Sequence, residues 1–262
     1  MDILIATIVV GIIGLGLGVA LVATGRKFHV ETDPREAAVR ELLPGNNCGA
    51  CGYAGCDAVA GAIAKGEAPA NACPVCSSDK AEQIAAVMGV KAEAAERHVA
   101  FVRCGGDCEK TSTVSQYVGV TDCRAAALAG LNPWACSPGC LGYGSCAAAC
   151  NYDAIHVIDG VAAVESSKCV GCGLCAAACP KGLIELIPAG KVAAVRCSSP
   201  DRGAEVRKLC AAGCLGCGIC VKQCLEEAVA LDGTLARVDY DKCVGCGRCA
   251  EKCPTHAVAL TE

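Results

Sequence analysis

The stretch Cys243–Pro254, CVGCGRCAEKCP, decides the fold of the C-terminal part of the chain. Its four cysteines are separated by two, two and three residues, and a proline follows the fourth. Such close spacing suits thiolates that share one metal centre, and soft thiolates are the ligands that iron and sulfide favour. Gly245 and Gly247 stand between the cysteines, where the backbone must pass a metal cluster without the obstruction of a Cβ atom. The stretch therefore predicts an iron–sulfur site.

The same pattern occurs at Cys169–Pro180, and together the two copies match the pattern of bacterial two-cluster ferredoxins. In that pattern three close cysteines bind one [4Fe–4S] cluster, and the fourth crosses to the other cluster. For the last copy we assign one cluster to Cys214, Cys217, Cys220 and Cys253, and its partner to Cys224, Cys243, Cys246 and Cys249. Zinc is the alternative, but structural zinc sites use four ligands rather than two interleaved sets.

The preceding copy is less regular. One cluster is expected on Cys150, Cys169, Cys172 and Cys175. Its partner lacks a ligand, because Tyr143 occupies the place that Cys217 has in the other copy. The expected set for the partner is Cys136, Cys140, Cys146 and Cys179, with Cys136 replacing the missing ligand; a three-iron cluster is the alternative.

These copies belong to an internal repeat. Residues 98–104 read HVAFVRC and residues 191–197 read KVAAVRC, and each phrase leads into the cysteine pattern. We expect a strand at 98–103 and another in the apolar stretch 257–260 near the C-terminus. The first copy carries an insertion that contains Cys108 and Cys123.

A separate cysteine block precedes the repeat. It contains Cys48, Cys51, Cys56 and Cys73, and we expect these to hold a further [4Fe–4S] cluster. A zinc ribbon is the alternative, because Cys48 and Cys51 form one C-x2-C pair and Cys73 and Cys76 form another. Cys56 and the glycines around it fit a cluster better, and the role of Cys76 stays open.

The remaining cysteines suggest a sixth cluster. It would draw its ligands from Cys104, Cys108, Cys123, Cys197 and Cys210. The alternative is that some of these are buried free thiols, which pack as small hydrophobic side chains. We therefore expect at least five [4Fe–4S] clusters, and a sixth whose ligands the spacing does not define.

The N-terminal segment predicts a membrane anchor. Residues 3–25 contain no charged residue, and about 20 apolar residues span a bilayer as a helix. Arg26 and Lys27 follow the apolar run, so the positive-inside rule places the N-terminus outside and the cysteine domains in the cytoplasm. The expected location is the cell inner membrane, with a single pass.

The overall composition excludes several classes of protein. The chain has 26 cysteines among 262 residues, and aromatic residues make up only 3%, so a conventional core would be thin. The cysteine spacing and the absence of an evident cleavable signal peptide disfavour a secreted disulfide scaffold. A net charge of −4 gives no basic face for nucleic acid.

This combination resembles the B subunits of Rnf complexes, in their long form with two ferredoxin-like units. The features that carry the resemblance are the uncharged N-terminal helix, the block CGACGYAGC at 48–56 and the ferredoxin repeats. The resemblance implies an α+β fold with a transmembrane anchor (1–27), a small [4Fe–4S] domain (28–90) and two ferredoxin-like units (91–190 and 191–262).

The resemblance also implies a function. The Rnf complex is an ion-translocating ferredoxin:NAD oxidoreductase of bacterial and archaeal membranes. A chain of this kind would take electrons from soluble ferredoxin on the cytoplasmic side and relay them to the membrane and flavin-bearing subunits, so it would be part of an enzyme without a complete active site of its own. The alternative is a membrane-tethered polyferredoxin that serves another redox complex such as a hydrogenase.

Overall fold

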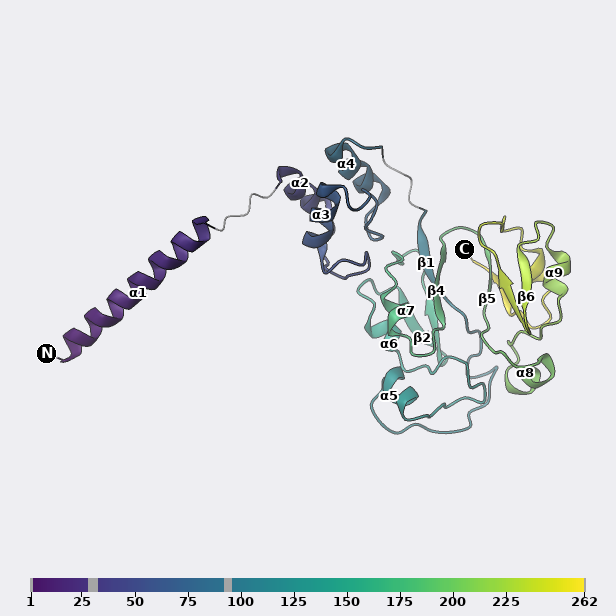
Figure 1. The fold of residues 1–262 in the computed structure, drawn as a ribbon. Helices are drawn as coiled ribbons and strands as arrows, with labels where there is room; N and C mark the ends of the chain where they lie inside the picture. Colours follow the sequence, from purple (N-terminus) through teal and green to yellow (C-terminus); the bar gives the residue numbers. More distant parts are fainter. Residues whose placement is uncertain (1, 28–32, 92–95, 262) are drawn as a thin grey trace.

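The computed structural model describes residues 2–27, 33–91 and 96–261 of the chain (Figure 1). Along the sequence, an N-terminal helix is followed by a small helical domain and then by two units that each combine short helices with paired strands. The cysteine-rich part is therefore an α+β structure, as the sequence predicts.

The N-terminal helix α1 spans Asp2–Lys27. Side chains 11–24 of this helix are exposed. Over the described ranges, no helix combines the length and the apolar character needed to cross a membrane. The prediction of a single transmembrane helix is therefore corrected, and with it the single-pass location in the inner membrane.

The small domain consists of α2 (Pro34–Leu42), α3 (Cys56–Lys65) and α4 (Ser78–Met88). Asp33 caps α2 by accepting a hydrogen bond from the Arg35 backbone N–H at 2.9 Å. Both α3 and α4 end at a glycine in the left-handed conformation. The helices pack around a small aliphatic core to which Cys56 and Cys73 also contribute.

The first ferredoxin-like unit is built from two antiparallel strand pairs. Strand β1 (His98–Val102) pairs with β4 (Ile184–Pro188), and β2 (Ile155–Ile158) forms a hairpin with β3 (Val161–Val164). The strand expected at 98–103 is thus confirmed. The short helices of this unit are α5 (Cys123–Leu128), α6 (Ser145–Ala148) and α7 (Leu174–Ala178).

The second unit repeats this topology. Strand β5 (Ala193–Val195) pairs with β8 (Val258–Leu260), and β6 (Val229–Asp232) forms a hairpin with β7 (Leu235–Val238). Its helices are α8 (Gly203–Leu209), α9 (Ile219–Gln223) and α10 (Arg248–Glu251). The internal repeat of the sequence is therefore a repeat of structure.

Equivalent hydrogen bonds mark the correspondence between the two units. The backbone N–H of Arg103 donates to the carbonyl of Leu183 at 2.7 Å, and that of Arg196 donates to the carbonyl of Ala257, also at 2.7 Å. Both arginines precede the cysteine that ends the VRC phrase. The two copies therefore place this cysteine at the same point of the fold.

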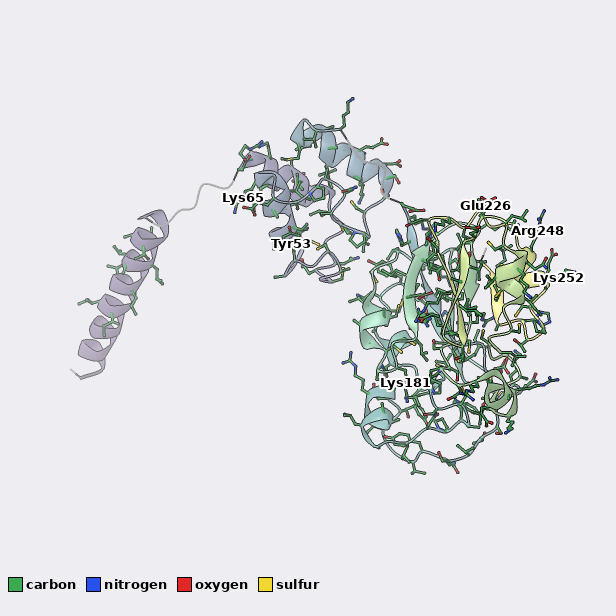
Figure 2. The ribbon with its side chains drawn as sticks, turned by 45° about the vertical axis from the view of Figure 1, so that its right-hand side comes forward. Tyr53, Lys65, Lys181, Glu226, Arg248 and Lys252 are labelled. Carbon is green, nitrogen blue, oxygen red and sulfur yellow. The ribbon has the colours of Figure 1, made fainter. Side chains whose placement is uncertain are left out.

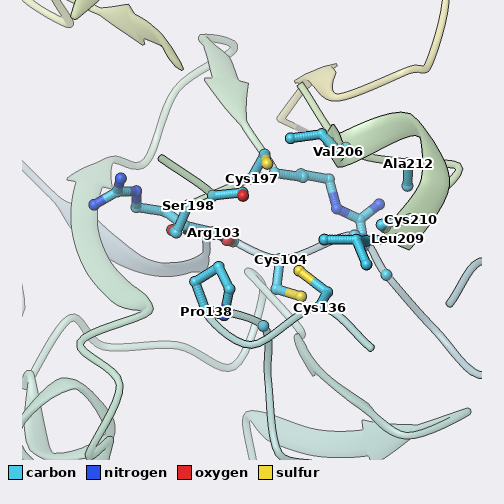
Figure 3. Close-up of a pocket in the computed structure, with 16 residues that line it drawn as sticks. Arg103, Cys104, Cys136, Pro138, Cys197, Ser198, Val206, Leu209, Cys210 and Ala212 are labelled. Carbon is cyan, nitrogen blue, oxygen red and sulfur yellow. Dashed lines mark hydrogen bonds between the residues drawn. The ribbon is translucent and has the colours of Figure 1, made fainter. Parts of the chain in front are cut away.

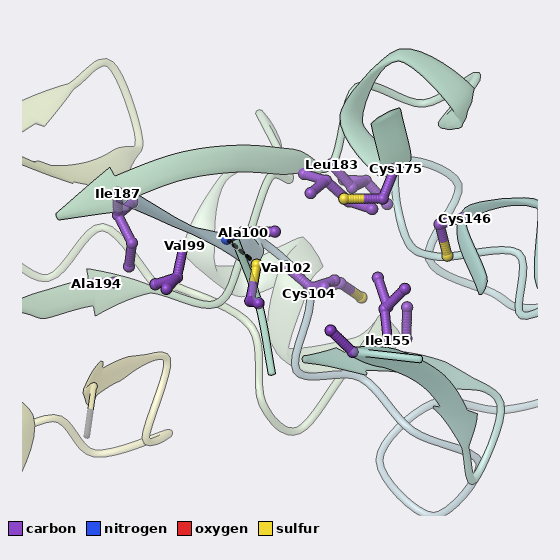
Figure 4. Packing of buried hydrophobic residues seen from close by; sticks show 14 of the residues in the cluster. Val99, Ala100, Val102, Cys104, Cys146, Ile155, Cys175, Leu183, Ile187 and Ala194 are labelled. Atoms are coloured by element: carbon purple, nitrogen blue, oxygen red, sulfur yellow. Dashed lines mark hydrogen bonds between the residues drawn. The ribbon is translucent and has the colours of Figure 1, made fainter. Parts of the chain in front are cut away.

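The two units share a core through β5. Successive side chains of a strand point to opposite faces. Ala194 packs into the core of the first unit with Val99 and Ile187, whereas Ala193 and Val195 pack into the core of the second (Figure 4). The two units are therefore joined by apolar packing as well as by the chain.

Charged side chains of both signs cover the outer edge of the second unit. Figure 2 shows Glu226, Arg248 and Lys252 around α9 and α10, and all three residues are exposed. Positive and negative charges are therefore interspersed on this edge.

Candidate iron–sulfur sites

One loop geometry occurs four times in the two units. In each loop a cysteine is followed by two glycines with positive φ, and the second glycine begins a short helix that carries another cysteine. The glycine pairs are Gly142 and Gly144, Gly171 and Gly173, Gly216 and Gly218, and Gly245 and Gly247. The left-handed conformation favours glycine because it has no Cβ atom. The repeated loop curls the backbone so that its cysteines converge.

The first glycine of each loop also touches the backbone of a neighbouring segment. A Cβ atom on Gly245 would lie 1.8 Å from the carbonyl oxygen of Lys191, and one on Gly171 would lie 2.4 Å from that of His98. Lys191 and His98 are equivalent residues of the repeat. The cysteine loops are therefore pressed against the repeated strand segments.

The strands supply hydrogen bonds to sulfur. The N–H of Ala100 in β1 donates to Sγ of Cys169 at 3.3 Å (dashed in Figure 4), and the N–H of Ala193 in β5 donates to Sγ of Cys243 at 3.4 Å. Hydrogen bonds to ligand sulfur atoms set the reduction potential of an iron–sulfur cluster. The fold thus presents donors where cluster ligands require them.

The fourth cysteine of each pattern lies in a turn of its own. The residue three positions later has a positive φ in every case: Asp153, Gly182, Glu227 and His256. In three of the turns the next N–H donates to the cysteine Sγ, as the N–H of Ala228 does to Cys224 at 3.3 Å. This turn directs the sulfur towards the neighbouring loop.

In the first unit the cysteines gather around two pockets. Group I, which lines one pocket, consists of Cys150, Cys169, Cys172 and Cys175. Group II, which lines the other, consists of Cys123, Cys140, Cys146 and Cys179. Group I matches the expected set. Group II contains Cys123 where the sequence analysis expected Cys136, so the inserted segment places a cysteine at the pocket whose loop has Tyr143 in place of a cysteine.

Burial and the negative charges of neighbouring cysteines raise the pKa values of thiols in these two groups. Burial, followed by the charges of Cys140, Cys123 and Cys179, raises the pKa of Cys146 to about 12. Burial and the charges of neighbouring group I cysteines likewise raise the pKa of Cys175 to about 11. Neutral thiols are thus favoured without a metal, and a bound metal centre must displace their protons.

The second unit contains the eight cysteines of the two sets predicted for it. We call the predicted sets group III, which consists of Cys214, Cys217, Cys220 and Cys253, and group IV, which consists of Cys224, Cys243, Cys246 and Cys249. Burial raises the pKa of Cys220 to about 11, and the charges of its three group III neighbours contribute. Burial also raises the pKa of Cys249, with contributions from Cys243 and Cys224. Cys217 and Cys246 are exposed, so both groups approach the surface.

The N-terminal group, Cys48, Cys51, Cys56 and Cys73, lies in the small domain. Cys51, Cys56 and Cys73 belong to or pack against its core, and the N–H of Cys56 donates to Oδ1 of Asn47 at 2.7 Å. A hydrogen bond from the Cys76 thiol lowers the pKa of Cys73 to about 6, which favours a thiolate at Cys73. Cys76 therefore lies beside the group as a partner of Cys73.

The small domain contacts the first unit close to group I. Asn46 Nδ2 donates to the Tyr152 hydroxyl at 2.6 Å. Burial is the main cause that raises the pKa of Tyr152, and the charges of Cys48, Cys172 and Cys73 add to it. Cysteines of the N-terminal group and of group I therefore lie near the same tyrosine.

The remaining predicted ligands separate into two kinds. Cys104, Cys136, Cys197 and Cys210 line another pocket, between the two units. Cys108 is exposed, and its N–H donates to the carbonyl of Asp159 at 2.9 Å. The sequence analysis expected Cys104, Cys108 and Cys123 as ligands of one sixth cluster. The structure instead places Cys108 and Cys123 outside the pocket that Cys104 lines.

The arrangement of sulfur atoms fits iron–sulfur clusters. All 26 cysteines lie in the described residues, and all are free thiols. Within the same residues, no three His, Cys, Asp or Glu side chains are placed to hold one metal ion. Free thiols gathered in groups of four are the ligands that [4Fe–4S] clusters take.

The fold and these groups define a ferredoxin-like iron–sulfur protein that binds multiple [4Fe–4S] clusters. The family described as "Putative Fe-S cluster" matches residues 43–75, and the family described as "4Fe-4S binding domain" matches residues 162–185 and 236–259. These ranges coincide with the small domain and with the second half of each unit.

Curated relatives place the chain more narrowly. It is 41% identical over 241 residues to the B subunit of the Na⁺-translocating ferredoxin:NAD⁺ oxidoreductase complex of Acetobacterium woodii, covering 92% of this chain and 72% of that protein. It is 42% identical over 234 residues to the B subunit of the proton-translocating complex of Clostridium ljungdahlii, covering 88% and 82%. Its counterpart in the ion-translocating oxidoreductase complex of Methanosarcina acetivorans is 38% identical over 231 residues, covering 88% of each. The chain belongs to this family, the B subunits of ion-translocating oxidoreductase complexes.

Proposed function

We propose that the chain is the iron–sulfur electron-relay component of an ion-translocating ferredoxin:NAD oxidoreductase complex. In this proposal it accepts electrons from reduced soluble ferredoxin and passes them to flavin-bearing and membrane subunits. Bound [4Fe–4S] clusters supply one-electron chemistry. The membership of the family and the succession of cysteine groups along the fold support this function.

The observation that carries the proposal is the adjacency of the groups. The charges of Cys48, in the N-terminal group, and of Cys172, in group I, both raise the pKa of Tyr152, so both cysteines lie near it. Helix α7 carries Cys175 of group I and is followed at once by Cys179 of group II. A relay needs this closeness, because each electron must pass from one cluster to the next through the protein.

The residues around the groups have roles that a relay requires. Buried aliphatic side chains exclude water from the sulfur atoms, and backbone N–H groups of β1 and β5 stabilise negative charge on ligand sulfur. No acid, base or substrate pocket is needed for this work. The chain therefore transfers electrons, and the chemistry at NAD belongs to another subunit.

Electron uptake from ferredoxin tests the proposal. The full chain, purified anaerobically, is mixed with reduced ferredoxin while its visible absorption is followed. We expect the iron–sulfur absorption to bleach at equilibrium, and dithionite gives the full reduction for comparison. Clusters that dithionite reduces but ferredoxin leaves oxidised would refute ferredoxin as the donor.

A second experiment tests the assembly. The tagged chain is isolated in mild detergent from the cell that naturally contains it, and the accompanying proteins are identified by mass spectrometry. We expect flavin-bearing and multi-span membrane subunits in stoichiometric amounts. Isolation with a hydrogenase instead would favour the polyferredoxin alternative.

A further inference from the structure

Four cysteines outside groups I–IV and the N-terminal group line one pocket between the two ferredoxin-like units. We call them the bridging group: Cys104, Cys136, Cys197 and Cys210. Cys104, Cys197 and Cys210 are only 7–8% exposed. Figure 3 shows the sulfurs of Cys104 and Cys136 close together, with Cys197 and Cys210 on other sides of the same pocket. Three buried thiols and the partly buried thiol of Cys136, from four separate segments, therefore line one pocket.

The bridging group follows the internal repeat. Cys104 and Cys197 end the two VRC phrases, directly after β1 and β5. Cys136 and Cys210 each stand four residues before the first cysteine of a ferredoxin loop, Cys140 or Cys214. Each copy of the repeat thus contributes one cysteine of each kind to the pocket.

Hydrogen bonds across the copies hold this arrangement. Ser198 Oγ, next to Cys197, donates to the carbonyl of Arg103 at 3.1 Å. Thr111, a buried residue, donates through Oγ1 to the carbonyl of Leu209 at 2.9 Å, beside Cys210. Within the first copy, Asn132 Nδ2 donates to the carbonyl of Cys136 at 3.0 Å. Each cysteine backbone is therefore fixed by its neighbours.

Glycines form part of the pocket wall, as they do in the ferredoxin loops. A Cβ atom on Gly106 would lie 2.9 Å from Sγ of Cys210, and one on Gly139 would lie 3.5 Å from Sγ of Cys136. The N–H of Cys140 donates to Sγ of Cys104 at 3.4 Å, which repeats the N–H to sulfur contact of the other groups. Arg103 and Arg196 also line the pocket, and Arg103 Nε lies 3.7 Å from Oε2 of Glu185.

We propose that the bridging group binds a sixth [4Fe–4S] cluster, which joins the two ferredoxin-like units. The proposal rests on the proposed function only in that the chain binds [4Fe–4S] clusters at all. The site lies between groups II and III, because Cys104 contacts the Cys140 backbone and Cys210 stands four residues before Cys214. An electron can therefore pass from one unit to the other through it.

Iron and sulfide content in matched variants tests the site. The full chain is purified anaerobically as the wild type, as Cys104→Ala, as Cys197→Ala, as the double variant and as Cys108→Ala. Alanine cannot act as a ligand, and Cys108 is the exposed control outside the groups. Iron, acid-labile sulfide and Mössbauer spectra are measured for each protein.

The bridging site predicts a non-additive loss. Wild type should contain about 24 iron atoms, and each bridging variant should lose about four of them, since one cubane holds four. The double variant should lose the same four, and Cys108→Ala should lose none.

Three results would overturn the site. They are a loss in Cys108→Ala without a loss in Cys197→Ala, an additive loss of about eight iron atoms in the double variant, or a fully loaded wild type with only about 20. If the variant proteins are too unstable to purify, the iron content of the wild type alone tests the site, because about 24 iron atoms support it and about 20 contradict it. A wild type without iron and sulfide would instead refute the cluster-binding function itself.

Discussion

Replacing Gly245 by alanine tests whether the cysteine loops depend on their close approach to the strand segments. Gly245 has φ +65°, and its added Cβ would lie 1.8 Å from the carbonyl oxygen of Lys191. Ordinary contact begins near 3.4 Å, so the loop and the strand must separate by about 1.6 Å. The Ala193 N–H to Cys243 Sγ bond, at 3.4 Å, cannot survive such a shift.

The expected cost has two parts. An alanine in the left-handed conformation costs about 1 kcal/mol. The displacement of β5 and the loss of its hydrogen bonds bring the total to about 3 kcal/mol or more. Gly233→Ala is the matched control, because Gly233 has φ +62° but nothing within 4 Å of its added Cβ. Gly233→Ala therefore includes only the cost of an alanine in the left-handed conformation, without a steric clash.

The assay is anaerobic thermal unfolding of the cluster-loaded chain at a fixed scan rate, followed by circular dichroism and visible absorption. For a unit of this size about 1 kcal/mol lowers the Tm by roughly 4–8 °C. We expect that shift for Gly233→Ala and a shift about three times larger for Gly245→Ala, with earlier loss of iron–sulfur absorption. Equal shifts in the two variants would refute the close approach of loop and strand.

Two further predictions concern the clusters themselves. Cys253→Ser should damage the cluster of group III, because the fourth cysteine crosses to the neighbouring set; unchanged iron content and EPR spectra in this variant would contradict the grouping. Removal of the clusters by a chelator under reducing conditions should unfold residues 130–262, because metal binding is coupled to folding and the aliphatic core is small; an apo-protein with undiminished circular dichroism would count against this expectation.

Much of the architecture follows from local sequence. The phrase HVAFVRC predicts β1, because β-branched and apolar residues favour strands, and the equivalent phrase KVAAVRC contains β5. The stretch 257–260 forms β8, as expected from its apolar run. Glycine is expected between the cysteines because the backbone must pass a cluster without a Cβ atom, and in the structure these glycines also adopt positive φ in every loop.

The groups to which Cys123 and Cys136 belong could not be predicted from local sequence. Cys123 joins group II from an insertion, and its N–H is held by Ser145 Oγ at 2.7 Å, 22 residues further along the chain. Cys136 turns to the other unit, towards Cys197 and Cys210. Spacing reports only neighbours along the chain, whereas these contacts depend on how the units pack. The position of Tyr143 signalled that a ligand was missing but not which cysteine replaced it.

The N-terminal segment shows another limit of sequence patterns. A run of residues without charge predicted a membrane-crossing helix, and a helix does form at Asp2–Lys27. Among the residues that the structure describes, however, no helix meets the requirements of length and apolarity together.

The central claim is that groups of four cysteines in this fold hold [4Fe–4S] clusters. Its most direct test is the determination of iron, zinc and acid-labile sulfide in the full chain purified without oxygen. The account predicts a brown protein with iron and sulfide in equal amounts, at least about 20 of each per chain, and no stoichiometric zinc. A colourless protein that contains zinc and lacks sulfide would contradict it.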